Sequence, residues 1–264
     1  MTLPQALVLR TAGTNCDAET ARALRMAGAE AEVLHLARLL EAPARLDELE
    51  IVVLAGGFSY GDDVAAGRVW GLELRHGLQQ ALRAFVDRGG LLLGVCNGFQ
   101  VLVESGFFDP ERSAGERDFA LTHNESNHYE CRWVTLEGQD CACPWIVPGE
   151  RMPTPVAHAE GRFTVRDAAV LERLRERRQI ALRYVPSDGE GAADYPANPN
   201  GSVDGIAGIC DPTGRVLGLM PHPERNLDPW QHPQWTRLAG EREVGEGLAF
   251  YERLVAHAAG ALQP

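Results

Sequence analysis

The chain has 264 residues, of which 45% are hydrophobic and 23% are charged, a balance that excludes disordered and fibrous classes. Its 25 basic and 37 acidic residues give a net charge of −12, which repels a phosphate backbone, so we expect no nucleic-acid partner. No apolar run approaches the roughly 18 residues that cross a bilayer, and residues 1–4 lead into a strand rather than a signal peptide. We therefore expect a cytoplasmic protein without a membrane partner.

Six cysteines are too few and too scattered for a disulfide framework, and reduced thiols are expected. Three of them, Cys131, Cys141 and Cys143, form a loose cluster. One C-x-C without a second close pair or a histidine at ligand spacing is a weak zinc signal. We expect no metal site.

The first half alternates apolar runs, at residues 6–9, 31–36, 51–55 and 91–95, with helical patterns at 17–26 and 73–87. Continuous apolar strands separated by helices predict a mostly parallel sheet that is flanked by helices on both faces. Ligands bind such sheets beyond the carboxyl ends of the strands. The loops that follow residues 55 and 95 therefore matter most.

The second half is less regular. Strands are predicted at residues 133–136, 180–184, 206–209 and 216–219, a short charged helix at 171–178 and a last helix at 245–259. Stretches rich in Pro, Gly, Asn and Asp at 143–155 and 187–204 are predicted as loops. No linker divides the chain, so we expect a single domain over residues 1–264.

The strongest motif is Gly94-Val95-Cys96-Asn97-Gly98, where a buried strand ends and a helix begins. Glycines two positions before and after the central residue relieve the crowding of a sharp turn, as in the nucleophile elbow of hydrolases. The pattern predicts that Cys96 stands clear of the sheet, in the open, as a nucleophile. The helix dipole contributes about 0.3–1 kcal/mol, whereas lowering a thiol pKa by two units takes about 2.7 kcal/mol, so a base partner is needed.

The best candidate for that base is His222, which directly follows the apolar run 216–219 and lies between two prolines. On a parallel sheet this strand end shares an edge with Cys96, and the prolines restrict the backbone. Glu224, two residues on, orients and stabilises the charged ring. Cys96, His222 and Glu224 are the predicted nucleophile, base and acid of a triad.

The loop at 56–62 follows the strand at 51–55 and begins with two glycines. Paired glycines let N–H groups approach an oxyanion closely, and Gly56 or Gly57 together with Asn97 is the predicted oxyanion hole. A simple tight turn is the alternative for the loop taken alone.

These residues resemble the triad-type (class I) glutamine amidotransferases, and within them the glutaminase subunits of phosphoribosylformylglycinamidine synthases. The resemblance spans nearly the whole chain and rests on residues 13–17 (GTNCD), 56–62 (GGFSYGD), 94–100 (GVCNGFQ), 131–134 (CRWV), 158–163 (HAEGRF), 198–202 (NPNGS) and 221–225 (PHPER). It implies a flavodoxin-like α/β fold with extra antiparallel strands in the second half.

The resemblance also implies the chemistry: Cys96 attacks the side-chain amide of glutamine and ammonia is released. The ammonia then passes to a large synthetase subunit, which performs the ATP-dependent amidation of formylglycinamide ribonucleotide in purine biosynthesis, and a small third subunit helps the complex to assemble. This chain is expected to bind no cofactor, with ATP and Mg on the synthetase. Predicted glutamine contacts are Phe58, Gln100, Glu160 and Arg162, although Glu160 and Arg162 also fit an ordinary hairpin or a partner contact.

Segment 121–155 is longer than in compact versions of this subunit, which leaves its contacts with the synthetase open. Cys16 is interpreted as a small buried residue behind the first strand. Three alternatives remain open. They are a glutaminase subunit of another amidotransferase, a stand-alone cysteine hydrolase on a related fold, and a binding subunit without catalysis.

Overall fold

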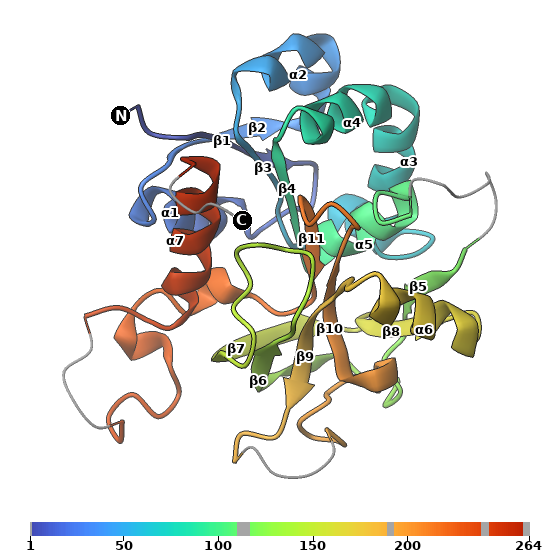
Figure 1. Ribbon diagram of the computed structural model, residues 1–264, viewed down its shortest axis with the longest axis vertical. Coiled ribbons are helices and arrows are strands. Elements are labelled where there is room, and N and C mark those ends of the chain that lie inside the picture. The colour runs from blue at the N-terminus through green and yellow to red at the C-terminus, as the bar shows by residue number, and fades with distance from the viewer. Residues whose placement is uncertain (1, 110–116, 189–192, 239–242, 261–264) are drawn as a thin grey trace.

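The computed structural model describes residues 2–109, 117–188, 193–238 and 243–260. Within them, nine strands form one mixed sheet in the order β2-β1-β3-β4-β11-β10-β9-β6-β7, and β5 pairs with β8 in a separate small sheet (Figure 1). The sheet thus joins strands from both halves of the sequence.

Five neighbouring strands of the large sheet are parallel: β2 (Glu30–His35), β1 (Gln5–Arg10), β3 (Ile51–Leu54), β4 (Leu91–Val95) and β11 (Val216–Leu219). Every residue of β3, β4 and β11 is buried, as expected for strands covered on both faces. Figure 1 shows α1 (Asp17–Met26) and α7 (Gly247–Ala258) side by side on one face. The other face carries α3 (Arg68–Gly77), α4 (Gln79–Asp87) and α5 (Asn97–Ser105). The predicted α/β class is confirmed.

The sheet continues with antiparallel strands: β10 (Ile206–Cys210), β9 (Ile180–Val185), β6 (Glu130–Gly138) and β7 (Arg151–His158). The small sheet pairs β5 (Phe119–Thr122) with β8 (Arg162–Val165). The remaining elements are α2 (Leu36–Glu41), α6 (Ala168–Glu176) and the 3-10 turns η1 (Pro43–Glu48), η2 (Ser59–Asp62), η3 (Val203–Gly205), η4 (Pro223–Arg225) and η5 (Pro229–Gln231). The extra antiparallel strands of the second half are therefore present.

Two element predictions were wrong. The helix expected at 73–87 is two helices, α3 and α4, because Leu78 between them has φ −129 and leaves the helical region. The loop expected at 143–155 holds the start of β7, whose residues alternate between covered and open positions. Its prolines, Pro153 and Pro155, are tolerated because β7 is an edge strand.

No helix in the described ranges has the length and apolar character needed to span a bilayer.

Candidate active site

The turn between β4 and α5 holds Cys96 in a conformation that few residues adopt. Cys96 has φ 52 and ψ −106, a positive φ that costs a non-glycine residue about 1–3 kcal/mol. Its N–H donates to the carbonyl of Leu219 at 2.8 Å, which ties the turn to the end of β11. Strain of this kind is characteristic of a nucleophile elbow.

The two glycines of the motif are there because no side chain fits at either position. A Cβ on Gly98 would lie 2.0 Å from the carbonyl oxygen of Leu54, and a Cβ on Gly94 would lie 2.6 Å from the carbonyl oxygen of Gly98. The helix therefore starts in contact with both β3 and β4. The glycines at both ends of the motif are thus explained by the close approach of α5 to these two strands.

His222 and Glu224 lie at the neighbouring strand end. β11 runs parallel to β4 with Leu219 beside Val95, so the turn that follows β11 reaches the same edge as Cys96. His222 Nδ1 lies 2.7 Å from Glu224 Oε1, and the two side chains are 2% and 0% exposed. Nδ1–H donates to the carboxylate, which leaves Nε2 without a partner in the described structure.

The imidazole is strongly biased toward its charged form. Burial alone would lower the pKa of His222, but the Glu224 carboxylate and the neighbouring thiols of Cys96 and Cys16 outweigh burial and raise the pKa well above its ordinary value. A charged imidazole of this kind is the usual partner of a nucleophilic cysteine. The site therefore has the charge arrangement of a cysteine nucleophile with its base.

The expectation that Cys96 stands in the open was wrong, because the residue is 4% exposed. The carboxyl end of β7 covers it: the Cys96 Sγ lies 3.8 Å from the carbonyl oxygen of Ala157, and the His222 N–H donates to the carbonyl of Pro155 at 2.9 Å. The cover comes from a strand that the sequence did not reveal.

The Gly-Gly loop is held by the segment that follows β1. The carbonyl of Gly56 accepts the N–H groups of Asn15 at 3.3 Å and Cys16 at 3.1 Å. In a trans peptide the next N–H, that of Gly57, points the opposite way. No acceptor within the described residues takes this N–H, which leaves Gly57 available as an oxyanion donor. Asn97, in the first turn of α5, contributes an N–H that has no partner within its helix.

Cys16 is buried as expected but lies against the triad. Its Sγ is 4.0 Å from His222 Nδ1 and 3.1 Å from an Arg225 nitrogen. Burial raises the pKa of Cys16 to about 11, so it stays a neutral thiol. Cys16 faces Nδ1 of His222, the nitrogen that is already bonded to Glu224. His222 therefore cannot activate the Cys16 thiol. Among the described residues, Cys16, His222 and Glu224 are the one group of three that brings potential metal ligands within 4.8 Å.

A polar network surrounds the first turn of α5. Asn97 Nδ2 donates to Gln100 Oε1 at 2.9 Å and to Asp62 Oδ1 at 3.2 Å, and Gln100 Nε2 donates to the carbonyl of Glu160 at 2.6 Å. The Glu160 carboxylate accepts the N–H of Ala66 at 3.2 Å. Gln100 and Glu160, both predicted substrate contacts, are thus brought together next to the nucleophile.

Asp62 was not predicted as a site residue. Burial and the nearby Glu160 carboxylate raise its pKa to about 6. The only sequence signal for Asp62 was its position in the GGFSYGD segment. Its repulsion by Glu160 could not be predicted, because that contact joins loops far apart in the chain.

The other two predicted substrate contacts, Phe58 and Arg162, have partners outside this network. Phe58 is 42% exposed, and its ring stacks on that of Tyr129 with the centroids 6.4 Å apart. Arg162 donates from Nε to the carbonyl of Gly201 at 3.1 Å and lies 3.8 Å from Glu125, so its recorded partners belong to the loops at 124–128 and 198–202. Tyr129 lies close enough to Cys96 and His222 for their charges to act on its pKa, which burial chiefly raises. It was missed because it lies in the 121–155 segment, where no motif marked it.

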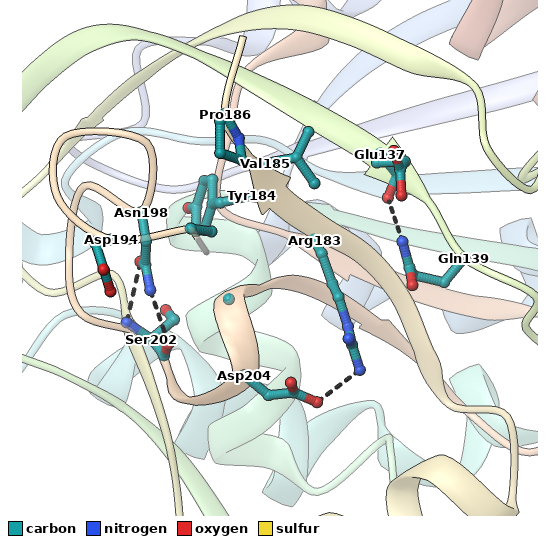
Figure 2. Close-up of a pocket in the computed structure, with 12 residues that line it drawn as sticks. Glu137, Gln139, Arg183, Tyr184, Val185, Pro186, Asp194, Asn198, Ser202 and Asp204 are labelled. Carbon is teal, nitrogen blue, oxygen red and sulfur yellow. Dashed lines mark hydrogen bonds and ion pairs between the residues drawn. The ribbon is translucent and has the colours of Figure 1, made fainter. Parts of the chain in front are cut away.

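A cavity of about 500 Å³ lies elsewhere, over the antiparallel strands. Arg183 and Asp204 form an ion pair of 2.6 Å within it. Figure 2 shows this pair with Glu137 and Gln139 on one side and Asn198 and Ser202 on the other. None of the triad residues lines it. This cavity is distinct from the cysteine site.

Comparisons with known proteins agree with this geometry. Residues 3–258 match the family model described as the CobB/CobQ-like glutamine amidotransferase domain. The phosphoribosylformylglycinamidine synthase subunit PurQ of Dehalococcoides mccartyi is 41% identical over 97% of this chain and 98% of its own length. PurQ of Methanococcus maripaludis is 42% identical over 88% of this chain and 86% of its own length.

Among solved structures, a chain in the PurLQS structure from Thermotoga maritima matches with a TM-score of 0.69 at 30% identity, covering 96% of this chain and 98% of that one. A glutamine amido transferase from Methylobacillus flagellatus, with a TM-score of 0.56 and 15% identity over 100% of this chain and 96% of that one, shares the fold. With the family model, the relatives and the elbow in agreement, the chain belongs to the CobB/CobQ-like glutamine amidotransferases and, within them, to the PurQ family.

Proposed function

We propose that this chain is the glutaminase subunit of a phosphoribosylformylglycinamidine synthase, which hydrolyses L-glutamine to glutamate and ammonia. The observation that carries the proposal is the meeting of Cys96, in a strained elbow, with a buried His222–Glu224 pair at adjacent parallel strand ends. The names of the relatives, PurQ and PurLQS, support the pathway.

The proposed reaction begins when the Cys96 thiolate adds to the carboxamide carbon of glutamine. The N–H groups of Gly57 and Asn97 stabilise the oxyanion, and His222 gives its proton to the departing nitrogen, which leaves as ammonia. Water, deprotonated by His222, then attacks the γ-glutamyl thioester. Glutamate leaves and the thiol is restored.

Glutamine also carries an α-ammonium group, and the Asp62 and Glu160 carboxylates next to α5 supply complementary charge. Gln100 joins both sides of this network. We propose that Gln100, Glu160 and Asp62 hold the amino-acid end of the substrate, while Phe58 lies at the rim. Arg162 is better placed to order the loop at 198–202 than to contact glutamine.

Ammonia released by this chain is proposed to pass to a large synthetase subunit, which converts formylglycinamide ribonucleotide to formylglycinamidine ribonucleotide with ATP and Mg; a small third subunit completes the complex. The chain itself is proposed to bind neither ATP nor Mg. A cytoplasmic location is supported by its six free thiols, which suit a reducing compartment.

The test is glutamate release by the chain reconstituted with its synthetase, formylglycinamide ribonucleotide and ATP. Cys96→Ala is expected to lower kcat by at least about 10³-fold, because removing a nucleophile that works with its base abolishes covalent catalysis. Cys131→Ser, which alters an exposed thiol on β6, is the matched control and should retain full activity. Wild-type activity in the Cys96 variant would refute the assignment.

A further inference from the structure

The carboxylate of Glu224 is held from two sides. Oε1 accepts from His222 Nδ1 at 2.7 Å, and Oε2 accepts from the hydroxyl of Tyr251 at 3.3 Å. Glu224 and Tyr251 are 1% and 0% exposed, so neither oxygen is solvated by bulk water. A buried carboxylate needs a donor at each oxygen.

Tyr251 comes from α7, far from the His-Pro-Glu turn in sequence but fixed against it in space. The N–H of Gly247 donates to the carbonyl of Asn226 at 2.8 Å, and the N–H of Gly245 donates to the carbonyl of Leu227 at 2.7 Å. A Cβ on Gly247 would lie 2.0 Å from the carbonyl oxygen of Pro223. The start of α7 therefore touches η4 directly.

This contact also sets which face of the helix meets the triad. Gly247 and Tyr251 are four residues apart and share one helix face. Because Gly247 lies on the turn, the face that carries Tyr251 is aimed at Glu224. The position of the hydroxyl thus follows from the docking of the helix.

We propose that Tyr251 is a positioning residue for glutamine hydrolysis: its hydroxyl holds the Glu224 carboxylate so that Oε1 remains in line with His222 Nδ1. The inference rests on the proposed function for its role in catalysis. Burial and the neighbouring Glu224 carboxylate raise the pKa of Tyr251 well above its ordinary value, so the hydroxyl remains a donor throughout the working pH range.

Two consequences follow from the chemistry. Without the donor, the carboxylate can turn about its Cγ–Cδ bond, and the imidazole loses its fixed direction toward Cys96. The hydroxyl dipole also withdraws charge from Glu224, so its loss leaves a more negative carboxylate that holds the His222 proton more tightly. The pH at which His222 loses its proton should therefore rise.

The experiment is Tyr251→Phe, which removes the oxygen and keeps the ring, assayed in the complex with the synthetase. We expect kcat to fall by roughly 3–30-fold, the scale of one hydrogen bond to a charged group, with KM for glutamine changed by less than about twofold. The alkaline limb of kcat/KM, which reports loss of the His222 proton, should move up by roughly half a pH unit.

A double-mutant cycle separates positioning from packing. If Tyr251 acts through Glu224, Tyr251→Phe in a Glu224→Gln background should change kcat by less than about twofold, because the carboxylate it orients is gone. An equal loss in both backgrounds, or an unshifted pH profile, would overturn the proposal. Tyr184→Phe, which removes another buried hydroxyl, bonded to Asn200, controls for lost stability and should leave the pH profile in place.

Two further measurements keep the outcome decisive. Titration of His222 by NMR with ¹⁵N-labelled histidine measures its pKa directly. The proposal for Tyr251 can then be judged even if the wild-type chain releases no glutamate. That result would refute only the proposed function. If Tyr251→Phe does not fold, incorporation of 3-fluorotyrosine at 251 retains the shape and strengthens the donor. The His222 proton should then be lost at lower pH, and a shift in the opposite direction would contradict the proposal.

Discussion

At the scale of single residues, the site depends on positions where the backbone leaves no alternative. Cys96 adopts a positive φ and lies close enough to His222 to raise the pKa of that residue, and Gly98 has no room for a Cβ beside Leu54. Gly57, with φ 141, would bring a Cβ to 2.6 Å from the N–H nitrogen of Asn15. The strained turn at Cys96 is held by the hydrogen bond from its N–H to the carbonyl of Leu219 at 2.8 Å.

The raised pKa of Asp62 predicts how the stability of the chain depends on pH. Burial and Glu160 raise its pKa from 3.8 to about 6, so between about pH 4 and 6 the folded chain holds a proton that the unfolded chain has released. The free energy of unfolding should fall as pH rises through this window, and the cost is complete above pH 6. Because Asp62 is only half-buried, we expect about 1–2 kcal/mol rather than the full shift.

Asp62→Asn should therefore be more stable than the wild type by about 1–2 kcal/mol at pH 8 and nearly equal to it at pH 4, since Asn retains an acceptor for Asn97. Urea unfolding at both pH values measures the difference. Asp63→Asn, on the same loop but exposed, controls for the loss of one negative charge. A variant that is less stable than the wild type at pH 8 would show that the Asp62 charge stabilises the fold.

At the scale of elements, the turn that carries His222 and Glu224 is held by two neighbours that come from distant parts of the chain. β7 lies over Cys96 and bonds to His222, and α7 bonds to the residues that follow Glu224. Asn226 connects the two: Nδ2 donates to the carbonyl of Pro153 at 2.8 Å and to Glu246 Oε2 at 3.0 Å. The turn is thus fixed between a strand and a helix.

Asn226→Ala should lower the free energy of unfolding by about 2–3 kcal/mol, because Asn226 is fully buried and its loss leaves the Pro153 carbonyl without a donor. Activity should fall as well, since η4 and α7 lose their common anchor. Thermal and urea unfolding give the first quantity and the glutaminase assay the second. Gln234→Ala, which alters an exposed residue between η5 and α7, is the control and should change the free energy of unfolding by less than about 0.5 kcal/mol. An equal loss in both variants would show that Asn226 does not anchor the turn.

At the scale of the whole molecule, the parallel half carries the proposed nucleophile, Cys96, and the proposed base, His222, while the antiparallel half covers them. Cys96 is 4% exposed as a result, whereas Cys131 on β6 is exposed. Access to the thiol should therefore depend on the size and shape of the reagent rather than on its reactivity alone.

In the free chain, a maleimide linked to polyethylene glycol is expected to modify Cys131 at least roughly tenfold faster than Cys96, because it is too large to pass β7. A glutamine-shaped chloroketone should reverse this preference, since the polar network binds its amino-acid end. Peptide mass spectrometry measures both rates, with Cys131→Ser as the control for assignment. Rapid labelling of Cys96 by the large reagent would mean that the cover over the site opens freely.

The parallel strands could be predicted from sequence, and the catalytic side chains could be proposed from it, because local patterns encode both. Continuous apolar runs predict β1, β3, β4 and β11. The glycines of the G-x-C-x-G motif occupy the two positions where a Cβ would clash with neighbouring backbone atoms. The family motifs supplied the proposed chemistry. Each of these signals lies within a few consecutive residues.

What only the tertiary structure decided was how distant segments meet. The start of β7 was predicted as a loop because of its prolines, which an edge strand tolerates. The cover that β7 forms over Cys96 was therefore not predicted either. The repulsion that raises the pKa of Asp62 and the hydroxyl that Tyr251 offers to Glu224 arise between loops and helices far apart in the chain. A contact of that kind depends on packing and desolvation, which have no period or spacing in the sequence. The sequence could therefore propose the residues of a triad, but not the groups that hold and cover them.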